Sequence, residues 1–235
     1  MKEKKGIKEI KTIKEIRKIK AVIFDMDGVI VDTEGIWDWA TAKAIAKYGK
    51  EYKREITKVM CVGKGFRESC NILINYYGLK VEVDTFINER RALVLDKYRN
   101  DVGFVHGFLH FFNSIIAPHY KTCVATASSQ MFIDLIDNKL DLFKLFKNKV
   151  YSIADVNYVP KPDPAIFLYA ADQLSVKPEE CVVIEDSPNG IKAAKAAGMK
   201  CIALSTTFDA KQLQEADIIV KSYEEIDLTC TKILS

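Results

Sequence analysis

From residue 121 onward, short apolar runs alternate with longer helical stretches, and this alternation constrains the fold more than any other feature of the chain. Short apolar runs bounded by turn-forming residues predict strands, and the periodic stretches between them predict helices. Strands that alternate with helices are typical of βα units, which assemble into a parallel sheet. We expect strands at 122–125, 150–153, 181–184, 200–204 and 216–220, and helices at 129–139, 165–173, 190–197 and 223–234.

Residues 35–104 follow a different pattern. After a first strand-like run at 21–24, this segment shows helical periodicity and no obvious strand. It is too long for one crossover helix and too apolar for a structureless loop, so it predicts a small helical domain inserted after the first strand. Gly35 on one side, and Gly103 and Gly107 on the other, could absorb a hinge rotation. The expected helices lie at 36–48, 66–77 and 83–98. The chain then divides into a basic N-terminal extension (1–20), an α/β core (21–34 and 105–235) and the inserted helical domain (35–104).

The net charge of +3 belongs to the N-terminal extension. Residues 1–20 hold nine Lys and Arg against three Glu, a balance of +6, so the chain total of +3 leaves −3 for the other residues. The charge of residues 21–235 therefore gives no sign of a basic, nucleic-acid-binding face. No stretch approaches the eighteen or so uninterrupted apolar residues of a membrane span. The extension itself is open to two interpretations, a solvated and partly helical tail or a segment that binds a membrane surface or a partner.

The six cysteines show no Cys-x-x-Cys motif and no paired spacing with histidine. Cys123, Cys181 and Cys201 lie inside apolar runs, where a free cysteine behaves as a small core residue. Free thiols are typical of a reducing compartment, so we expect a cytoplasmic protein.

Two carboxylates, Asp25 and Asp27, end the first apolar run. Open α/β sheets form their active sites at the carboxyl ends of strands. Two carboxylates one residue apart suit a division of labour, with one as nucleophile or metal ligand and the other as proton donor. The alternative is an ordinary acidic turn after a strand.

Three further polar segments each follow a predicted strand. Thr126-Ala127-Ser128 offers a hydroxyl and backbone N–H groups at a helix start, which suits an anion. Lys161 stands between two prolines, whose rigid backbone would aim its side chain. Glu185 and Asp186 end a strand much as the first pair does. Taken singly, these segments could be a helix cap, a surface loop and an exposed turn.

If the four segments converge, three or four carboxylates lie beside one ammonium group and a hydroxyl. Carboxylates that close repel one another and would repel a phosphate dianion unless a divalent cation lies between them. Ligands that are all oxygen favour a hard ion, and Mg²⁺ commonly combines a few carboxylates with substrate phosphate. The residues therefore predict a Mg²⁺-dependent phosphoryl-transfer site.

The same motifs carry a family resemblance, in order, over roughly residues 20–220. They are Phe24-Asp25-Met26-Asp27-Gly28-Val29, Asp32-Thr33-Glu34, Thr126-Ala127-Ser128, Lys161-Pro162-Asp163-Pro164, and Glu185-Asp186-Ser187-Pro188-Asn189-Gly190 with Ala193-Ala194 and Ala197-Gly198-Met199. The chain resembles the haloacid dehalogenase-like hydrolase superfamily, in the subgroup that contains β-phosphoglucomutase and many small-metabolite phosphatases. The resemblance implies a Rossmann-like parallel sheet core with an inserted small helical cap domain that closes over the site.

The resemblance also implies a role for each matching residue. Asp25 would attack phosphorus and become an aspartyl-phosphate, and Asp27 would protonate the leaving oxygen and then activate water. Phosphate would be bound by Thr126, by the Ala127 N–H and by Lys161; Mg²⁺ would be bound by the side chains of Asp25 and Asp186 and the backbone carbonyl of Asp27, with Glu185 as a further ligand, direct or through water. Two positions depart from the family pattern, Pro160 before Lys161 and His106 before Gly107, and neither removes a catalytic group.

The reaction could be hydrolysis or phosphosugar isomerisation. A dehalogenase is excluded, because dehalogenation does not use a second aspartate and this chain has one, Asp27. β-Phosphoglucomutase has a histidine and an arginine in its cap where this chain places Trp37 and Phe66, with Arg67 one position later. A mutase must bind a distal phosphate, so the missing arginine favours a phosphatase.

We therefore expect a monomeric Mg²⁺-dependent phosphatase that acts on a small phosphorylated metabolite, of the sugar phosphate or nucleoside monophosphate type. The alternatives are a β-phosphoglucomutase-type mutase and a catalytically idle member that binds or regulates. The loop at 60–69 resembles the Gly-Lys loop of pseudouridine-5′-phosphatase-like members, so Lys64 or Arg67 could face the leaving group; a solvated loop is the alternative.

Overall fold

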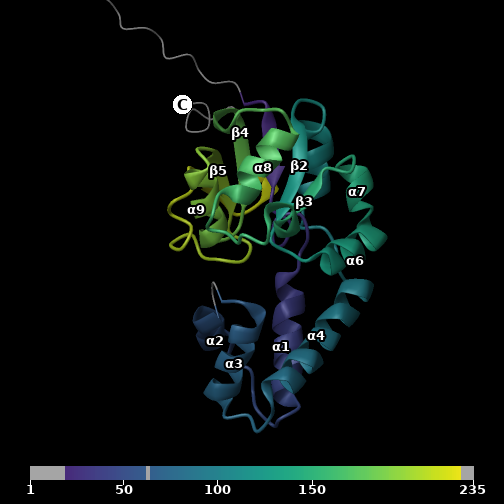
Figure 1. The fold of residues 1–235 in the computed structure, drawn as a ribbon, viewed down its shortest axis with the longest axis vertical. Coiled ribbons are helices and arrows are strands. Elements are labelled where there is room, and N and C mark those ends of the chain that lie inside the picture. Colours follow the sequence, from purple (N-terminus) through teal and green to yellow (C-terminus); the bar gives the residue numbers. More distant parts are fainter. Residues whose placement is uncertain (1–18, 62–63, 229–235) are drawn as a thin grey trace, which may run out of the picture.

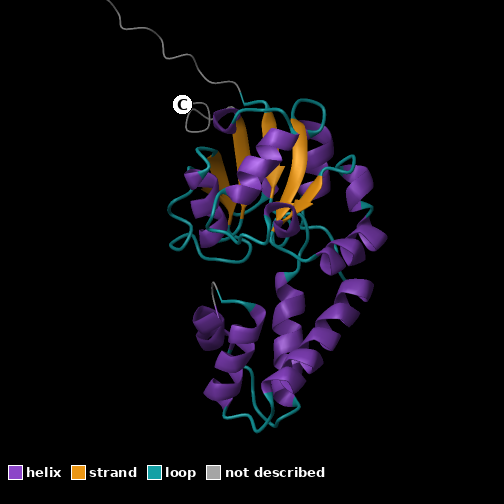
Figure 2. Cartoon of the chain, viewed as in Figure 1, coloured by secondary structure: helices purple, strands orange, loops and turns teal. Residues whose placement is uncertain are grey.

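The computed structural model describes residues 19–61 and 64–228 of the chain. Six parallel strands form one sheet in the order β3-β2-β1-β4-β5-β6 (Figures 1 and 2). This confirms the predicted α/β fold class with a Rossmann-like parallel sheet. The strands are β1 (Ala21–Phe24), β2 (Lys121–Thr126), β3 (Val150–Ser152), β4 (Cys181–Glu185), β5 (Lys200–Leu204) and β6 (Ile218–Val220).

Helices cover both faces of this sheet, which is why β1, at its centre, is apolar at every position. Alternate side chains of each strand point to opposite faces. Ala21 and Ile23 of β1 face the layer formed by α8 (Ala165–Gln173) and α9 (Pro188–Ala196). Val22 and Phe24 face the opposite layer. That layer contains α5 (Phe108–Phe111), the π-helical turn Phe112–Ile116, α6 (Gln130–Leu140) and α7 (Leu142–Leu145).

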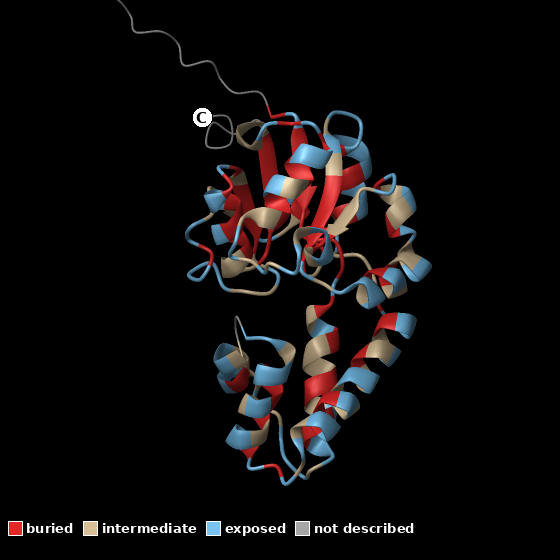
Figure 3. Cartoon of the chain, viewed as in Figure 1, coloured by how far each residue is buried: buried red, intermediate tan, exposed pale blue. Residues whose placement is uncertain are grey.

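A group of four helices lies beyond the carboxyl ends of the strands (Figures 1 and 2). These are α1 (Glu34–Ala46), α2 (Arg54–Cys61), α3 (Phe66–Tyr77) and α4 (Val83–Asn100). They bury a small apolar core of their own, formed by Ala44, Ile45, Cys70, Leu73, Tyr77, Leu79, Phe86 and Ile87. Buried positions follow the inner faces of these helices, while their outer faces are exposed (Figure 3). We call α1 to α4 the cap helices.

Most predicted elements are present, and the closing helix is the exception. The structure has only a 3₁₀ turn at Tyr223–Glu225, and residues 226–228 are not helical, so the expected helix at 223–234 is wrong for the described residues. Tyr223 is buried, and its hydroxyl donates to the Val29 carbonyl at 2.7 Å. Ile226 and Leu228 are buried as well, so the segment packs as an extended strap. Residues 229–234 lie outside the described range.

The N-terminal extension falls almost entirely outside the described residues. Ile19 is buried in the core, and the Lys20 N–H donates to the Glu180 carbonyl at 2.9 Å. The cysteines Cys123, Cys181 and Cys201 are free and buried, as predicted. Within the described ranges, no helix combines the length and the apolar character needed to cross a bilayer.

Candidate active site

The sheet order brings the predicted residues together. β1 lies between β2 and β4, and Phe24 pairs with Val124 on one side and Ile184 on the other. The residues that follow these strands therefore emerge at one edge of the sheet. A cavity of about 320 Å³ at this edge is lined by all six predicted site residues, Asp25, Asp27, Thr126, Ala127, Lys161 and Asp186.

Lys161 is the cation at the base of this cavity. Its ammonium donates to Asp25 Oδ1 at 2.5 Å, to Glu185 Oε1 at 2.7 Å and to the Ala125 carbonyl at 3.3 Å. Only 7% of its side chain is exposed. Burial opposes its charge, but the carboxylates of Asp25 and Glu185 outweigh burial and raise the pKa of Lys161 above its usual range. Pro160, which departs from the family pattern, therefore does not prevent Lys161 from contacting the carboxylates of Asp25 and Glu185.

Negative charge is crowded around Lys161. Burial raises the pKa of Asp25 to about 7, with Glu185 and Asp27 adding to the effect and Lys161 opposing it. Burial also raises the pKa of Asp186, with further contributions from Glu185 and Asp25. One ligand oxygen from each of Asp25, Glu185 and Asp186 lies within 4.8 Å of the others. A buried donor set made only of carboxylate oxygens fits a hard divalent cation, which would relieve this repulsion.

Glu185 is already held by protein donors. Its Oε2 accepts from the N–H groups of Asp186 and Ser187 and from the Ser187 hydroxyl, each at 2.9 Å, while Oε1 accepts from Lys161. The carboxylate lies directly against Gly190, where a Cβ atom would come within 1.7 Å of Oε1. Gly190 is thus needed to let Glu185 reach Lys161 across the start of α9.

Asp27 is held differently, by two hydroxyl groups. The Tyr98 hydroxyl donates to Oδ1 at 3.1 Å, and the Ser128 hydroxyl donates to Oδ2 at 2.5 Å. The Ser128 N–H in turn donates to Thr126 Oγ1 at 3.0 Å. Burial and the neighbouring Asp27 carboxylate raise the pKa of Tyr98, so its hydroxyl stays a proton donor.

Sequence reasoning missed Tyr98. It ends a helical apolar pattern on α4, far from every motif, and nothing local distinguishes it from a core tyrosine. Ser128 belongs to the Thr126-Ala127-Ser128 motif, in which the family resemblance implies a role only for Thr126 and Ala127.

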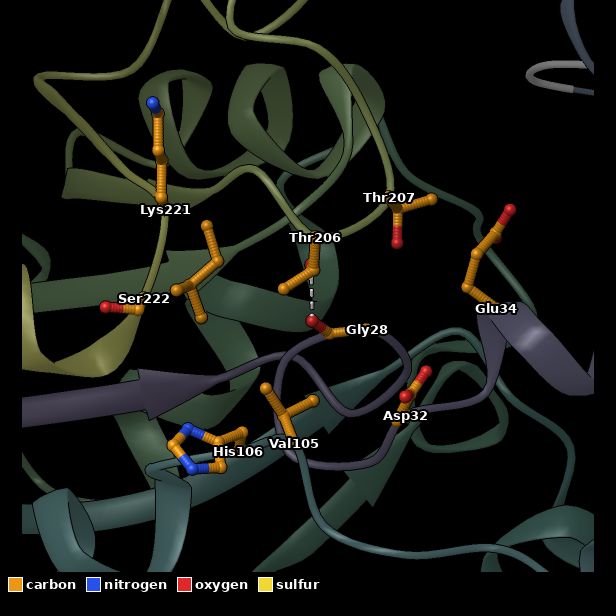
Figure 4. Close-up of a pocket in the computed structure, with 10 residues that line it drawn as sticks. Gly28, Asp32, Glu34, Val105, His106, Thr206, Thr207, Lys221 and Ser222 are labelled. Atoms are coloured by element: carbon orange, nitrogen blue, oxygen red, sulfur yellow. Dashed lines mark hydrogen bonds between the residues drawn. The ribbon is translucent and has the colours of Figure 1, made fainter. Parts of the chain in front are cut away.

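The turn after Asp27 depends on glycine. Gly28 has a φ of +74°, and a Cβ atom there would lie 2.0 Å from Asp186 Oδ2 and 2.6 Å from Thr207 Oγ1. Its carbonyl accepts from the Thr206 hydroxyl at 2.6 Å, as Figure 4 shows. The absence of a side chain therefore lets Asp186 and the Thr206–Thr207 loop close around the turn. A second cavity, of about 260 Å³, lies on the side of Gly28 drawn in Figure 4, lined partly by Asp32 and His106.

The cap helices complete the mouth of the active-site cavity. Glu34 and Trp37 of α1 line it, together with Thr207 and Phe208 from the loop after β5. Lys58 of α2 pairs with Glu34 and donates to the Thr207 carbonyl at 2.8 Å, so it joins the cap to the core loop.

Lys64 and Arg67 do not line this cavity. Lys64 pairs with Glu68 at 2.8 Å, and Arg67 pairs with Asp84 at 2.5 Å, both on exposed surface. This arrangement agrees with the solvated-loop interpretation.

Comparison with known proteins assigns the chain to a family. The model of the haloacid dehalogenase-like hydrolases matches residues 19–198. The chain belongs to the haloacid dehalogenase-like hydrolase family. This confirms the resemblance drawn from the motifs, and the match covers β1, the cap helices and the strands up to β4.

Its curated relatives include named phosphatases. The chain is 34% identical to the probable pseudouridine-5′-phosphatase of Drosophila melanogaster, over 77% of this chain and 79% of that protein. It is 33% identical to the phosphorylated carbohydrates phosphatase of Thermotoga maritima, over 85% of this chain and 92% of the relative.

Solved structures of the family share the fold. A haloacid dehalogenase-like protein of unknown function from Agrobacterium tumefaciens superimposes with a TM-score of 0.77 at 26% identity, over 88% of this chain and 95% of that one. The β-phosphoglucomutase of Clostridium difficile superimposes with a TM-score of 0.68 at 24% identity, over 90% and 94% of the two chains. The latter likeness concerns the fold alone.

Proposed function

We propose that this haloacid dehalogenase-like hydrolase is a Mg²⁺-dependent phosphatase that hydrolyses a small phosphorylated metabolite through an aspartyl-phosphate intermediate. The observation that carries the proposal is the position of Asp25, which lies in contact with Lys161 and within a cluster of buried carboxylates. A carboxylate nucleophile of this kind needs positive charge beside it to approach a phosphate dianion. The two phosphatase relatives support the same reaction class.

In the proposed first step, an oxygen of Asp25 forms a bond to phosphorus while the bond from phosphorus to the leaving oxygen breaks. Asp27, in its protonated form, gives its proton to that leaving oxygen. In the second step, Asp27 takes a proton from water, which attacks phosphorus and releases inorganic phosphate and the free Asp25 carboxylate. The hydroxyls of Tyr98 and Ser128 hold Asp27 in one orientation for both steps.

Other residues bind the phosphate group and hold the metal. We assign the phosphate oxygens to the Thr126 hydroxyl, the Ala127 N–H and Lys161. Mg²⁺ would be held by the side chains of Asp25 and Asp186 and the backbone carbonyl of Asp27, and when bound it supplies positive charge for the phosphate oxygens. Because protein donors already occupy both oxygens of Glu185, we assign this residue to positioning Lys161, with any contact to the metal made through water.

We propose that residues 35–104 act as the cap domain, with the core at 21–34 and 105–235. Closure would exclude bulk water from the site and bring Trp37 over the leaving group. The Lys58 contact to the Thr207 carbonyl would hold the closed position. We further propose a cytoplasmic monomer, since the buried free thiols suit a reducing compartment.

The proposed substrates are sugar phosphates and nucleoside monophosphates. The mutase is the weaker alternative, because aromatic rings stand where a mutase cap has its histidine and arginine. The rings of Trp37 and Phe66 contact each other with centroids 5.6 Å apart.

The test is phosphate release from a panel of phosphorylated sugars, nucleotides and small acids, with Mg²⁺ and with a chelator. The Asp25→Asn protein is the control, and glucose 1-phosphate is followed separately for conversion to glucose 6-phosphate. We expect release that needs both Mg²⁺ and Asp25. Isomerisation without release would replace the proposal with the mutase, and neither activity in folded protein would replace it with a binding role.

A further inference from the structure

A third cavity adjoins the active site on its cap side. It measures about 250 Å³ and shares Glu34, Trp37, Thr207 and Phe208 with the active-site cavity. A substrate whose phosphate lies at Asp25 would therefore extend its leaving group past these four residues into the cap. We call this second space the cap cavity.

Arg90 of α4 lines the cap cavity and is held rigidly there. Its guanidinium lies over the ring of Trp37 at 5.5 Å and over the ring of Phe66 at 5.1 Å. Its Nε donates to Thr41 Oγ1 at 3.0 Å, and the Thr41 hydroxyl donates to the Trp37 carbonyl at 2.7 Å. A planar cation stacked and bonded in this way loses little freedom when it binds a ligand.

Among the described residues, no carboxylate pairs with Arg90. The other two cations beside this cavity have carboxylate partners, Lys58 with Glu34 and Arg54 with Asp38. Across the described parts of the chain, Arg90 forms no ion pair, and besides Thr41 its only acceptor is the Cys70 sulfur at 3.8 Å. A half-buried guanidinium without a carboxylate partner is a site for an anion.

Four hydroxyls also line the cap cavity, those of Thr41, Tyr52, Thr57 and Ser69. The Asp38 carboxylate lines it as well, where it accepts from Arg54 and from the Tyr52 hydroxyl. Hydroxyls along the wall, with a guanidinium that no described carboxylate pairs with, suit a leaving group that is a hydroxylated chain or ring with an anionic end. A sugar phosphate with no charge besides the reacting phosphate would leave the Arg90 guanidinium without an anionic partner.

We propose that Arg90 selects substrates that carry a second anionic group, a carboxylate or a phosphate, on the part of the molecule distant from the reacting phosphate. This inference rests on the proposed phosphatase function and narrows its substrate class. Arg90 is then a specificity residue of the cap, contributed by α4, and the Trp37 and Phe66 rings hold it in position.

The test compares substrates that differ only at the distal group. The carboxylate pair is 6-phosphogluconate against sorbitol 6-phosphate, and the phosphate pair is fructose 1,6-bisphosphate against fructose 6-phosphate. Binding to Asp25→Asn protein is measured by calorimetry, which needs no turnover. We expect the anionic member of one pair to bind roughly 10- to 100-fold more tightly, as one charge-assisted contact allows. The pair that shows the preference tells which anion the cavity takes.

Variants of two adjacent arginines then locate the preference. In Asp25→Asn protein, a second substitution Arg90→Met should abolish the preference for the anionic compound. Arg90→Lys should keep part of that preference, because the charge remains while the planar guanidinium is lost. Arg91→Met is the matched control. Arg91 is exposed and contacts Phe66 at 5.7 Å, but lines neither cavity, so its loss should leave the preference unchanged.

Equal binding within both pairs would overturn the proposal, and so would a preference that Arg90→Met leaves undiminished. Thermal melts show whether Arg90→Met is folded; if it is not, a preference in Arg90→Lys as large as that of the Arg90 protein would overturn the proposal. Failure of the phosphatase function has a separate signature. Wild-type protein with Mg²⁺ would then release no phosphate from any of the four compounds or from p-nitrophenyl phosphate, whatever the binding ratios are.

Discussion

Replacing Lys161 with methionine tests how the buried charges of the active site are balanced. The variant keeps most of the side-chain volume and removes the ammonium that contacts both Asp25 and Glu185. Removing one partner of a buried ion pair costs about 3–5 kcal/mol, since the other partner remains buried without compensation. For a chain of this length, each kcal/mol lowers Tm by about 2–4 °C, so we expect a loss of roughly 10 °C at pH 8 with chelator present.

The loss of stability in Lys161→Met should depend on pH, and the raised pKa of the Asp25 carboxylate decides whether it grows or shrinks as pH rises. Burial already raises the pKa of Asp25 to about 7 in the folded protein, against about 4 when unfolded. A raised folded pKa means that stability is present at low pH and is lost as pH rises through the folded value. Without Lys161 the folded pKa rises further, so Lys161→Met should lose much more stability at pH 8 than at pH 5.

The assay is thermal unfolding of wild type and Lys161→Met at pH 5 and pH 8 without metal. Lys121→Met is the control, because the Lys121 ammonium donates to the Leu174 carbonyl at 2.8 Å and forms no ion pair with a described carboxylate. Its effect should be small and independent of pH. A Lys161→Met loss that is equal at the two pH values, or no larger than that of Lys121→Met, would refute the charge-balance reasoning.

Three further changes have expected outcomes. Asp186→Asn should raise Tm at pH 8 without metal, because burial raises the pKa of Asp186 and so makes its ionisation destabilising. The gain should vanish at pH 4, and Mg²⁺ should raise the Tm of the variant less than that of wild type. Tyr98→Phe removes one of the two hydroxyls on Asp27 and should lower kcat by about 10- to 100-fold and shift the pH profile of kcat. Gly190→Ala should lower the free energy of unfolding by about 1–3 kcal/mol, measured by urea denaturation, because its Cβ overlaps Glu185.

Matched controls separate these effects from general damage. Tyr76→Phe alters an exposed tyrosine outside the site, and Gly65→Ala places a Cβ where no atom lies within 4 Å. Tyr76→Phe should keep the kcat of wild type, and Gly65→Ala should keep its free energy of unfolding. Mg²⁺ stabilisation that is undiminished in Asp186→Asn would contradict the metal assignment, and full activity in Tyr98→Phe would show that Ser128 alone orients Asp27.

Much of the fold followed from local patterns in the sequence. The helices predicted at 66–77 and 165–173 have those same bounds in the structure, because their apolar spacing and end residues act within a few turns of chain. Carboxylates directly after buried strands predicted where the site lies, since parallel strands end at one edge. The segment after 223 was mispredicted because its apolar residues pack against distant core residues, which local periodicity does not record.

The sequence by itself therefore determined the parallel sheet, the helical segment after its first strand and the meeting of Asp25, Asp27, Lys161 and Asp186 at one edge. Their spacing alone restricts the chemistry, because acids and a lysine placed after strands can meet only at that edge. Only the tertiary structure placed the Tyr98 hydroxyl on Asp27, engaged Glu185 with Lys161 and set Arg90 in the cap cavity with no carboxylate partner among the described residues. These contacts join residues on separate elements, and whether such residues meet depends on strand order and on how the cap helices lie over the sheet.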